Sequence, residues 1–84
     1  MTYRIKIISK AEKDLDAISG NDFDALKKKI LSLYAHPRPF GSQKLTNEDG
    51  YRIRAGDFRV LYRINDKAKE IIIYRIKHRR DAYR

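Results

Sequence analysis

Residues 51–64 read YRIRAGDFRVLYRI, and this stretch decides the fold. Arginines alternate with apolar residues on both sides of Gly56-Asp57, a dipeptide typical of a tight turn. The alternation predicts two antiparallel strands, Tyr51–Ala55 and Phe58–Ile64, each with one apolar and one cationic face. A cationic sheet face is what the binding of a polyanion requires, and nucleic acid is the obvious polyanion.

The residues before this hairpin predict one strand and two helices. Tyr3–Ile8 alternates apolar and basic residues, which is typical of a half-buried strand. Ser9 is expected to cap the first helix, and Gly20 to end it. The second helix should begin at Asn21 or Asp22 and end where the next proline forces the chain out of the helical region. Each helix has apolar residues at helical spacing and hence one buried face.

The remaining segments complete a single α+β domain of residues 1–84. Residues 40–50 are expected to form a loop, and Glu70–His78 a central strand, because it is apolar on both faces. Along it, one face is expected to contain Ile72, Tyr74 and Ile76, and the other Ile71, Ile73, Arg75 and Lys77. The order β-α-α-β-β-β predicts a small, mainly antiparallel four-stranded sheet with both helices packed on one face. The open face of the hairpin then contains Arg52, Arg54, Arg59, Leu61 and Arg63.

Charge is concentrated in the same part of the chain. The formal net charge is +9, and residues 51–84 contain 11 Lys or Arg against 4 Asp or Glu. Such a local excess favours an anionic partner, although a merely soluble surface is the alternative. There is no cysteine, and His36 and His78 lack the spacing of metal ligands, so neither metal nor cofactor is expected. No apolar run is long enough to span a membrane, which makes a cytoplasmic protein the default.

Several side chains of the cationic face can converge on one phosphate site. Arg52 and Arg54 are about 6.6 Å apart along one strand face, and Arg59 lies across the hairpin from them. Arg79 and Tyr83 can add charge and an aromatic surface for base stacking. His78 is either a proton shuttle near this face or a structural residue at the end of its strand. The helix aspartates are interpreted as solvated charges: Asp14, Asp16, Asp22 and Asp24.

Two motifs, YRIRAGDFRVLY at 51–62 and HRRDAY at 78–83, resemble the RelE/ParE superfamily of toxins from toxin–antitoxin pairs. The resemblance covers nearly the whole chain. It implies a metal-independent mRNA endonuclease of the RelE kind, which acts on messenger RNA in the ribosomal A site. In the implied reaction, the ribose 2′-OH attacks the adjacent phosphate and leaves a 2′,3′-cyclic phosphate and a 5′-OH.

The resemblance also implies roles for individual residues. Arg52 and Arg54 match two basic residues of the second strand, and Arg59 matches the arginine that stabilises the transition-state phosphate. Arg79, with Arg80 as the alternative, matches the basic residue after the last strand, which serves as an acid or as a phosphate clamp. Tyr83 matches the near-terminal tyrosine that stacks on or orients the scissile nucleotide. Further contacts to RNA are expected from Arg63, Lys77, Arg80 and Arg84.

Arginine stands at positions 52 and 54, where some members of the superfamily have lysine. A guanidinium loses its proton only above about pH 12, so neither residue suits the role of general base. His78 or Tyr83 is then the more attractive proton carrier.

The resemblance further implies an acidic RelB-like antitoxin that neutralises the basic face. Two alternatives to the nuclease stay open. One is a ParE-like inhibitor of DNA gyrase, and the other is a basic RNA-binding module without catalytic activity.

Overall fold

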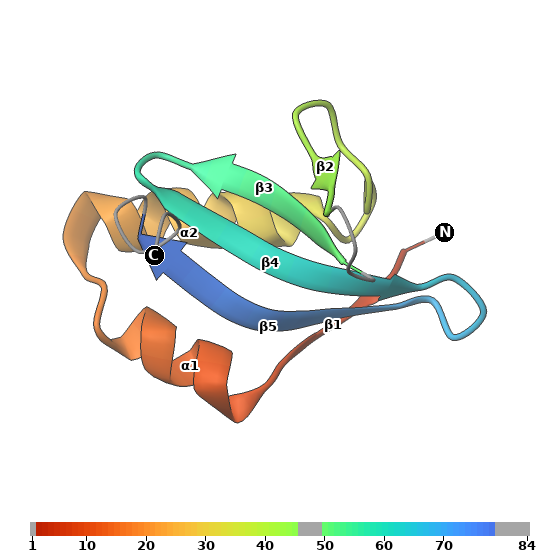
Figure 1. The fold of residues 1–84 in the computed structure, drawn as a ribbon, viewed down its shortest axis with the longest axis horizontal. Coiled ribbons are helices and arrows are strands. Elements are labelled where there is room, and N and C mark those ends of the chain that lie inside the picture. The colour runs from red at the N-terminus through yellow and green to blue at the C-terminus, as the bar shows by residue number, and fades with distance from the viewer. Residues whose placement is uncertain (1, 46–49, 79–84) are drawn as a thin grey trace.

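The computed structural model describes residues 2–45 and 50–78, and within them five strands form one sheet in the order β1-β5-β4-β3-β2 (Figure 1). The strands are β1 (Arg4–Ile7), β2 (Gln43–Lys44), β3 (Tyr51–Ala55), β4 (Phe58–Asn65) and β5 (Glu70–His78). β1 pairs parallel to β5, and the other pairs are antiparallel. The predicted α+β class and the central place of the last strand are confirmed. The predicted strand count of four was wrong, because β2 lies in the stretch expected to be a loop and is too short to show a pattern.

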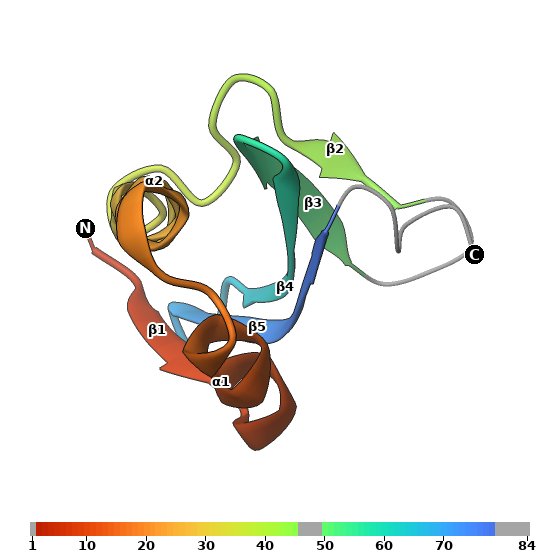
Figure 2. The same ribbon diagram turned by 90° about the vertical axis from the view of Figure 1, so that its left-hand side faces the viewer.

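The two helices, α1 (Ser9–Asp16) and α2 (Gly20–Ser32), lie on the same side of the curved sheet, as predicted (Figure 2). α1 packs against β5, whereas α2 lies over β3 and β4. One hydrophobic core joins the helices to the sheet: Ala11, Leu26, Ile30, Leu33, Ile53, Ala55, Val60, Tyr62, Ile71, Ile73 and Ile76. Burial of this single face leaves the other face of the sheet open for polar side chains.

The helix boundaries differ from the prediction at two residues. Ile8, and not Ser9, occupies the N-cap of α1, and no side chain caps this helix. Its backbone N–H is still bonded to the carbonyl of Ile73, so the chain passes from β1 into α1 with no intervening turn. Gly20 does not end α1, which stops at Asp16. Gly20 instead begins α2 with φ = 65°, a conformation that glycine adopts without strain.

The predicted faces of the hairpin are confirmed. Ile53, Val60 and Tyr62 are at most 2% exposed, and Gly56 turns the chain with φ = 62°. Because side chains alternate along a strand, the arginines between these residues belong to the opposite face.

A β-bulge in β5 breaks the alternation expected there. Tyr62 pairs with Ile73 while Leu61 pairs with Arg75, so Tyr74 is the additional residue. Ile76 consequently shares the core face with Ile71 and Ile73, and the predicted grouping of Ile76 with Ile72 and Tyr74 was wrong.

Asp14 of α1 covers the edge of β5 where β1 ends. β1 pairs with β5 only as far as Ile73. Beyond that point, Asp14 Oδ2 accepts hydrogen bonds from the backbone N–H of Ile76 (2.9 Å) and from Arg75 Nε (3.0 Å). The interpretation of Asp14 as a solvated charge was therefore wrong. Its carboxylate takes the place of a strand neighbour.

A second polar cluster joins three distant segments at the turn between β4 and β5. Arg38 donates from Nη2 and Nη1 to the two carboxylate oxygens of Asp66, at 2.9 and 3.3 Å. The Tyr3 hydroxyl donates to Asp66 Oδ1 (2.7 Å), and Arg38 Nε donates to the Tyr51 hydroxyl (3.1 Å). The hydrogen bond from Arg38, followed by that from Tyr3, lowers the pKa of Asp66 from 3.8 to about 2.

Replacing Asp14 by alanine should lower the free energy of unfolding by about 1–3 kcal/mol, because a partly buried backbone N–H and a guanidinium lose their acceptor. Asp16→Ala, at an exposed position of the same helix, is the matched control and should change stability by less than about 0.5 kcal/mol. Urea denaturation of both variants measures the difference. Equal stabilities of the two variants would contradict the edge role of Asp14.

The Asp66 cluster should stabilise the fold in a pH-dependent way. The pKa of Asp66 is lower in the folded protein, so its contribution is complete above pH 3.8 and is lost as the pH falls through about 2. Asp66→Asn should therefore be less stable than the parent at pH 6, with the difference shrinking towards pH 2. Thermal unfolding of both proteins between pH 6 and pH 2 measures this difference, and Asp24→Asn on the exposed surface of α2 is the control. If the stability difference between Asp66→Asn and the parent were the same at every pH, the pH-dependent contribution of Asp66 would be contradicted.

Candidate nucleic-acid interface

Three cations lie side by side in one row across the open face of the sheet. Arg54 of β3 is directly opposite Arg59 of β4, which is directly opposite Lys77 of β5. Like charges in directly opposite positions destabilise a sheet. The three cations of the row therefore repel one another, and an anion that lies over the row relieves this repulsion.

Arg52 is held in place beside this row. It is paired with Gln43 of β2, whose side-chain oxygen Oε1 accepts from Arg52 Nε (2.9 Å) and also from Arg52 Nη2. This fixes the plane of the guanidinium, so less entropy is lost when it binds a phosphate. Gln43 was missed by the sequence analysis, because a two-residue strand gives no alternation from which to predict it.

Arg59 is shielded from solvent, with only 7% of its surface exposed. The sequence predicted that Arg59 lies on the open face, but it did not indicate this shielding. A shielded guanidinium has a stronger electrostatic effect on a bound anion than one fully surrounded by water. Of the three cations in the row, Arg59 is therefore best suited to stabilise negative charge on a bound anion.

Two hollows border Arg54 on either side. The larger, about 520 Å³, is lined by Gly41, Gln43, Arg52 and Arg54. The smaller, about 250 Å³, is lined by the hairpin turn together with Arg54 and Arg59. Both are open to solvent, and Arg54 itself is exposed. An extended anionic chain can thus pass from Arg52 to the neighbouring pair of Arg54 and Arg59.

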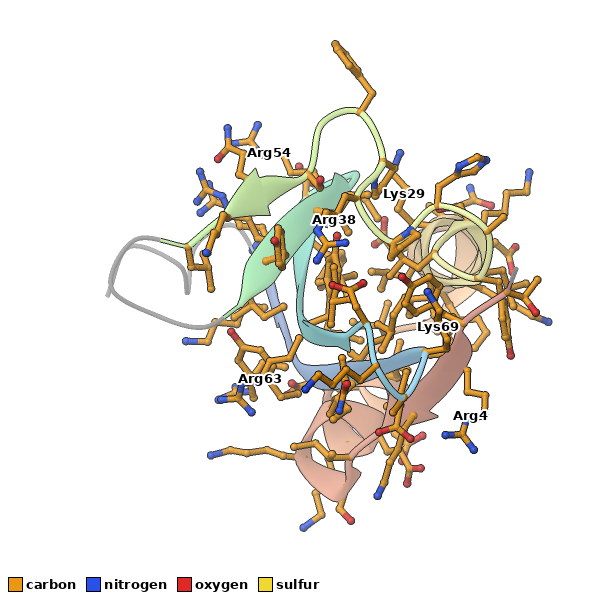
Figure 3. The ribbon with its side chains drawn as sticks, turned by 90° about the vertical axis from the view of Figure 1, so that its right-hand side faces the viewer. Arg4, Lys29, Arg38, Arg54, Arg63 and Lys69 are labelled. Atoms are coloured by element: carbon orange, nitrogen blue, oxygen red, sulfur yellow. The ribbon has the colours of Figure 1, made fainter. Side chains whose placement is uncertain are left out.

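The other predicted site residues fall into three groups. Arg63 shares the open face, and Figure 3 shows Arg54 and Arg63 extending on the side of the sheet away from α2. The structure does not bring His78 to the cationic row. Its ring meets Phe58 edge-on with 5.1 Å between centroids, and Lys77 next to it belongs to the opposite face. The remaining group lies outside the described residues: Arg79, Arg80, Tyr83 and Arg84.

The described part of the interface can bind and polarise a phosphate. Its guanidiniums supply planar, bidentate donors and fixed positive charge. They do not exchange protons near neutral pH. These guanidiniums therefore do not suit the role of a general acid or base.

Residues 2–45 and 50–78 contain neither a cluster of metal ligands nor a helix that could span a membrane. No three His, Cys, Asp or Glu side chains gather there in a way that would hold a metal ion. Neither helix in this part of the chain is long and apolar enough to cross a membrane.

Comparison with known families identifies the chain. The family described as the ParE toxin of the type II toxin–antitoxin system parDE matches residues 5–83. The chain belongs to this toxin family. It is 32% identical over 88 residues to a protein named as the toxin RelE1 of Methanocaldococcus jannaschii, covering 100% of this chain and 98% of that protein.

Solved structures agree with this assignment. The toxin is similar to RelE in the archaeal RelE–RelB complex of Pyrococcus horikoshii, with 36% identity, a TM-score of 0.82, and 94% of this chain and 97% of that chain covered. It is also similar to a chain of the RelBE2 toxin–antitoxin complex of Mycobacterium tuberculosis, with 26% identity, a TM-score of 0.83, and coverage of 94% and 100%. The predicted RelE-like branch of the superfamily is confirmed.

Repulsion within the cationic row should lower the stability of the fold, and this can be tested without any assay of activity. Arg54→Gln should raise the free energy of unfolding by about 0.2–1 kcal/mol at low salt, because the positive charge opposite Arg59 is removed. The gain should shrink at 0.5 M salt, which screens exposed charges. Lys28→Gln on α2 is the control away from the row. A loss of stability in Arg54→Gln at low salt would contradict repulsion.

Proposed function

We propose that this toxin is a ribosome-dependent mRNA endoribonuclease that inhibits translation. The observation that supports it is the row of Arg54, Arg59 and Lys77, with Arg52 fixed beside it by Gln43. The relatives named RelE support the same proposal. The ribosome as the place of action implies that the toxin acts in the cytoplasm.

The proposed chemistry needs no metal ion. The 2′ oxygen of the ribose bonds to the adjacent phosphorus and gives up its proton, and the bond from phosphorus to the 5′ oxygen breaks. The 5′ oxygen takes up a proton, which leaves a 2′,3′-cyclic phosphate and a 5′-OH. Negative charge builds up on the phosphoryl oxygens in the transition state. Arg59 lies in the row where such charge is stabilised, while Arg52 and Arg54 hold the strand through its phosphates.

Proton transfer is assigned to residues outside the cationic row. Of the two predicted carriers, His78 lies against Phe58 on the other face of β5. We therefore assign the proton carrier to Tyr83, and the clamp on the leaving side to Arg79, on the strength of the superfamily resemblance.

The proposed partner in the cell is an acidic antitoxin of the RelB type. Similar toxins were solved in complexes with RelB. A net charge of +9 favours a negatively charged partner that covers the basic face and neutralises it.

Replacing Arg59 should abolish cleavage. Arg59→Ala and Arg59→Gln, added to translating ribosomes, should cleave mRNA at least roughly 100-fold more slowly than the parent, because the transition state loses a fixed charge. Lys28→Ala on the exposed surface of α2 is the control and should cleave at the parental rate. Primer extension maps the 5′ ends, and circular dichroism confirms that the variants are folded.

Three outcomes would overturn the proposal. Intact mRNA with the parent toxin would exclude the nuclease. DNA breaks linked to gyrase without loss of mRNA would indicate the ParE-like activity instead. RNA binding without cleavage by the parent would indicate a non-catalytic module.

A further inference from the structure

We propose that Arg63, stacked on Tyr74, forms a nucleobase-binding platform on the open face, separate from the phosphate row. This inference rests on the proposed function in that it takes single-stranded RNA to be the ligand. It adds a subsite that recognises a base by stacking, whereas the cationic row holds phosphates.

The β-bulge in β5 positions the aromatic half of the platform. Tyr74 is the additional residue between Ile73 and Arg75, and bulges re-aim side chains in this way. Its hydroxyl reaches Gly50, the residue immediately before β3. A Cβ atom at Gly50 would lie 2.8 Å from that hydroxyl, closer than such atoms approach in proteins. The Tyr74 side chain therefore crosses the sheet from β5 to the start of β3, and the missing side chain of Gly50 makes room for it.

Arg63 completes the platform from β4. Its guanidinium carbon is 4.5 Å from the centre of the Tyr74 ring, a distance typical of a cation–π contact. Arg63 is nevertheless exposed. A guanidinium held on one side by an aromatic ring presents a rigid plane, and RNA bases stack on such planes. Lysine has no plane and cannot replace arginine in this role.

The position of the platform fits a strand that already lies on the cationic row. Arg63 follows Arg59 by four residues on the same face of β4, which is about 13 Å at the rise of a strand. This is twice the separation of Arg52 and Arg54 along β3. If those two arginines hold adjacent phosphates, the base on Arg63 belongs to a nucleotide about two positions away from the phosphate at Arg59.

A binding experiment separates stacking from charge. The probes are two fluorescently labelled 2′-O-methyl RNA octamers, one with all its bases and one in which every nucleotide is abasic. The 2′-O-methyl group prevents cleavage, so affinity is measured independently of catalysis. The parent should bind the octamer with bases about 5- to 100-fold more tightly than the abasic one.

Arg63→Lys keeps the charge and removes the plane, so it should weaken binding of the normal octamer by about 5-fold or more and leave the abasic octamer nearly unchanged. Gly50→Ala should have the same effect, because the new methyl group collides with the Tyr74 hydroxyl and so shifts the whole side chain. Tyr74→Phe keeps the ring and should bind both probes as the parent does. Lys28→Ala is the control away from the sheet face.

The result distinguishes this inference from the proposed function. If Arg63→Lys discriminates between the two octamers as well as the parent does, the platform is refuted even when the toxin cleaves mRNA. If Arg63→Lys and Gly50→Ala lose the discrimination while the parent fails to cleave mRNA on ribosomes, the platform stands and the nuclease proposal fails.

Discussion

Burial of one face of the sheet against two helices is the constraint on which the cationic surface depends. Ile53, Val60 and Tyr62 can reach the core only if the residues between them point away from it. Those residues are mostly arginines, so packing of the core and display of charge follow from the same alternation. Repulsion among the displayed cations is offset by hydrophobic burial on the other face. The fold can thereby hold like charges together before any anion is bound.

The β-bulge in β5 modifies this simple scheme. Before it, Ile71 and Ile73 face the core, and after it Ile76 does. Without this shift, strict alternation would exchange the faces of Lys77 and His78. The bulge therefore places Lys77 at the end of the cationic row and His78 beside Phe58. It also directs Tyr74 towards Gly50, where it supports Arg63.

Most of the cationic surface could be predicted from the sequence, because alternation is a local property. A two-residue turn at Gly56 also implied that Arg59 lies across from Arg52 and Arg54. Other contacts could not be predicted in this way. Asp14 looks like any helix-surface aspartate until β1 ends and leaves the N–H of Ile76 without a strand partner. Gln43 likewise carries no signal until β2 pairs with β3.

The sequence by itself determined the toxin family, the α+β class and which side chains share a face within each strand of the hairpin. Only the tertiary structure decided which of these side chains meet across strands: Arg54 with Arg59 and Lys77, Gln43 with Arg52, and Tyr74 with Arg63. The physical reason is that the two-residue period of a strand follows from local backbone geometry. Register, bulges and edge contacts depend instead on how segments far apart in the chain pack against one another.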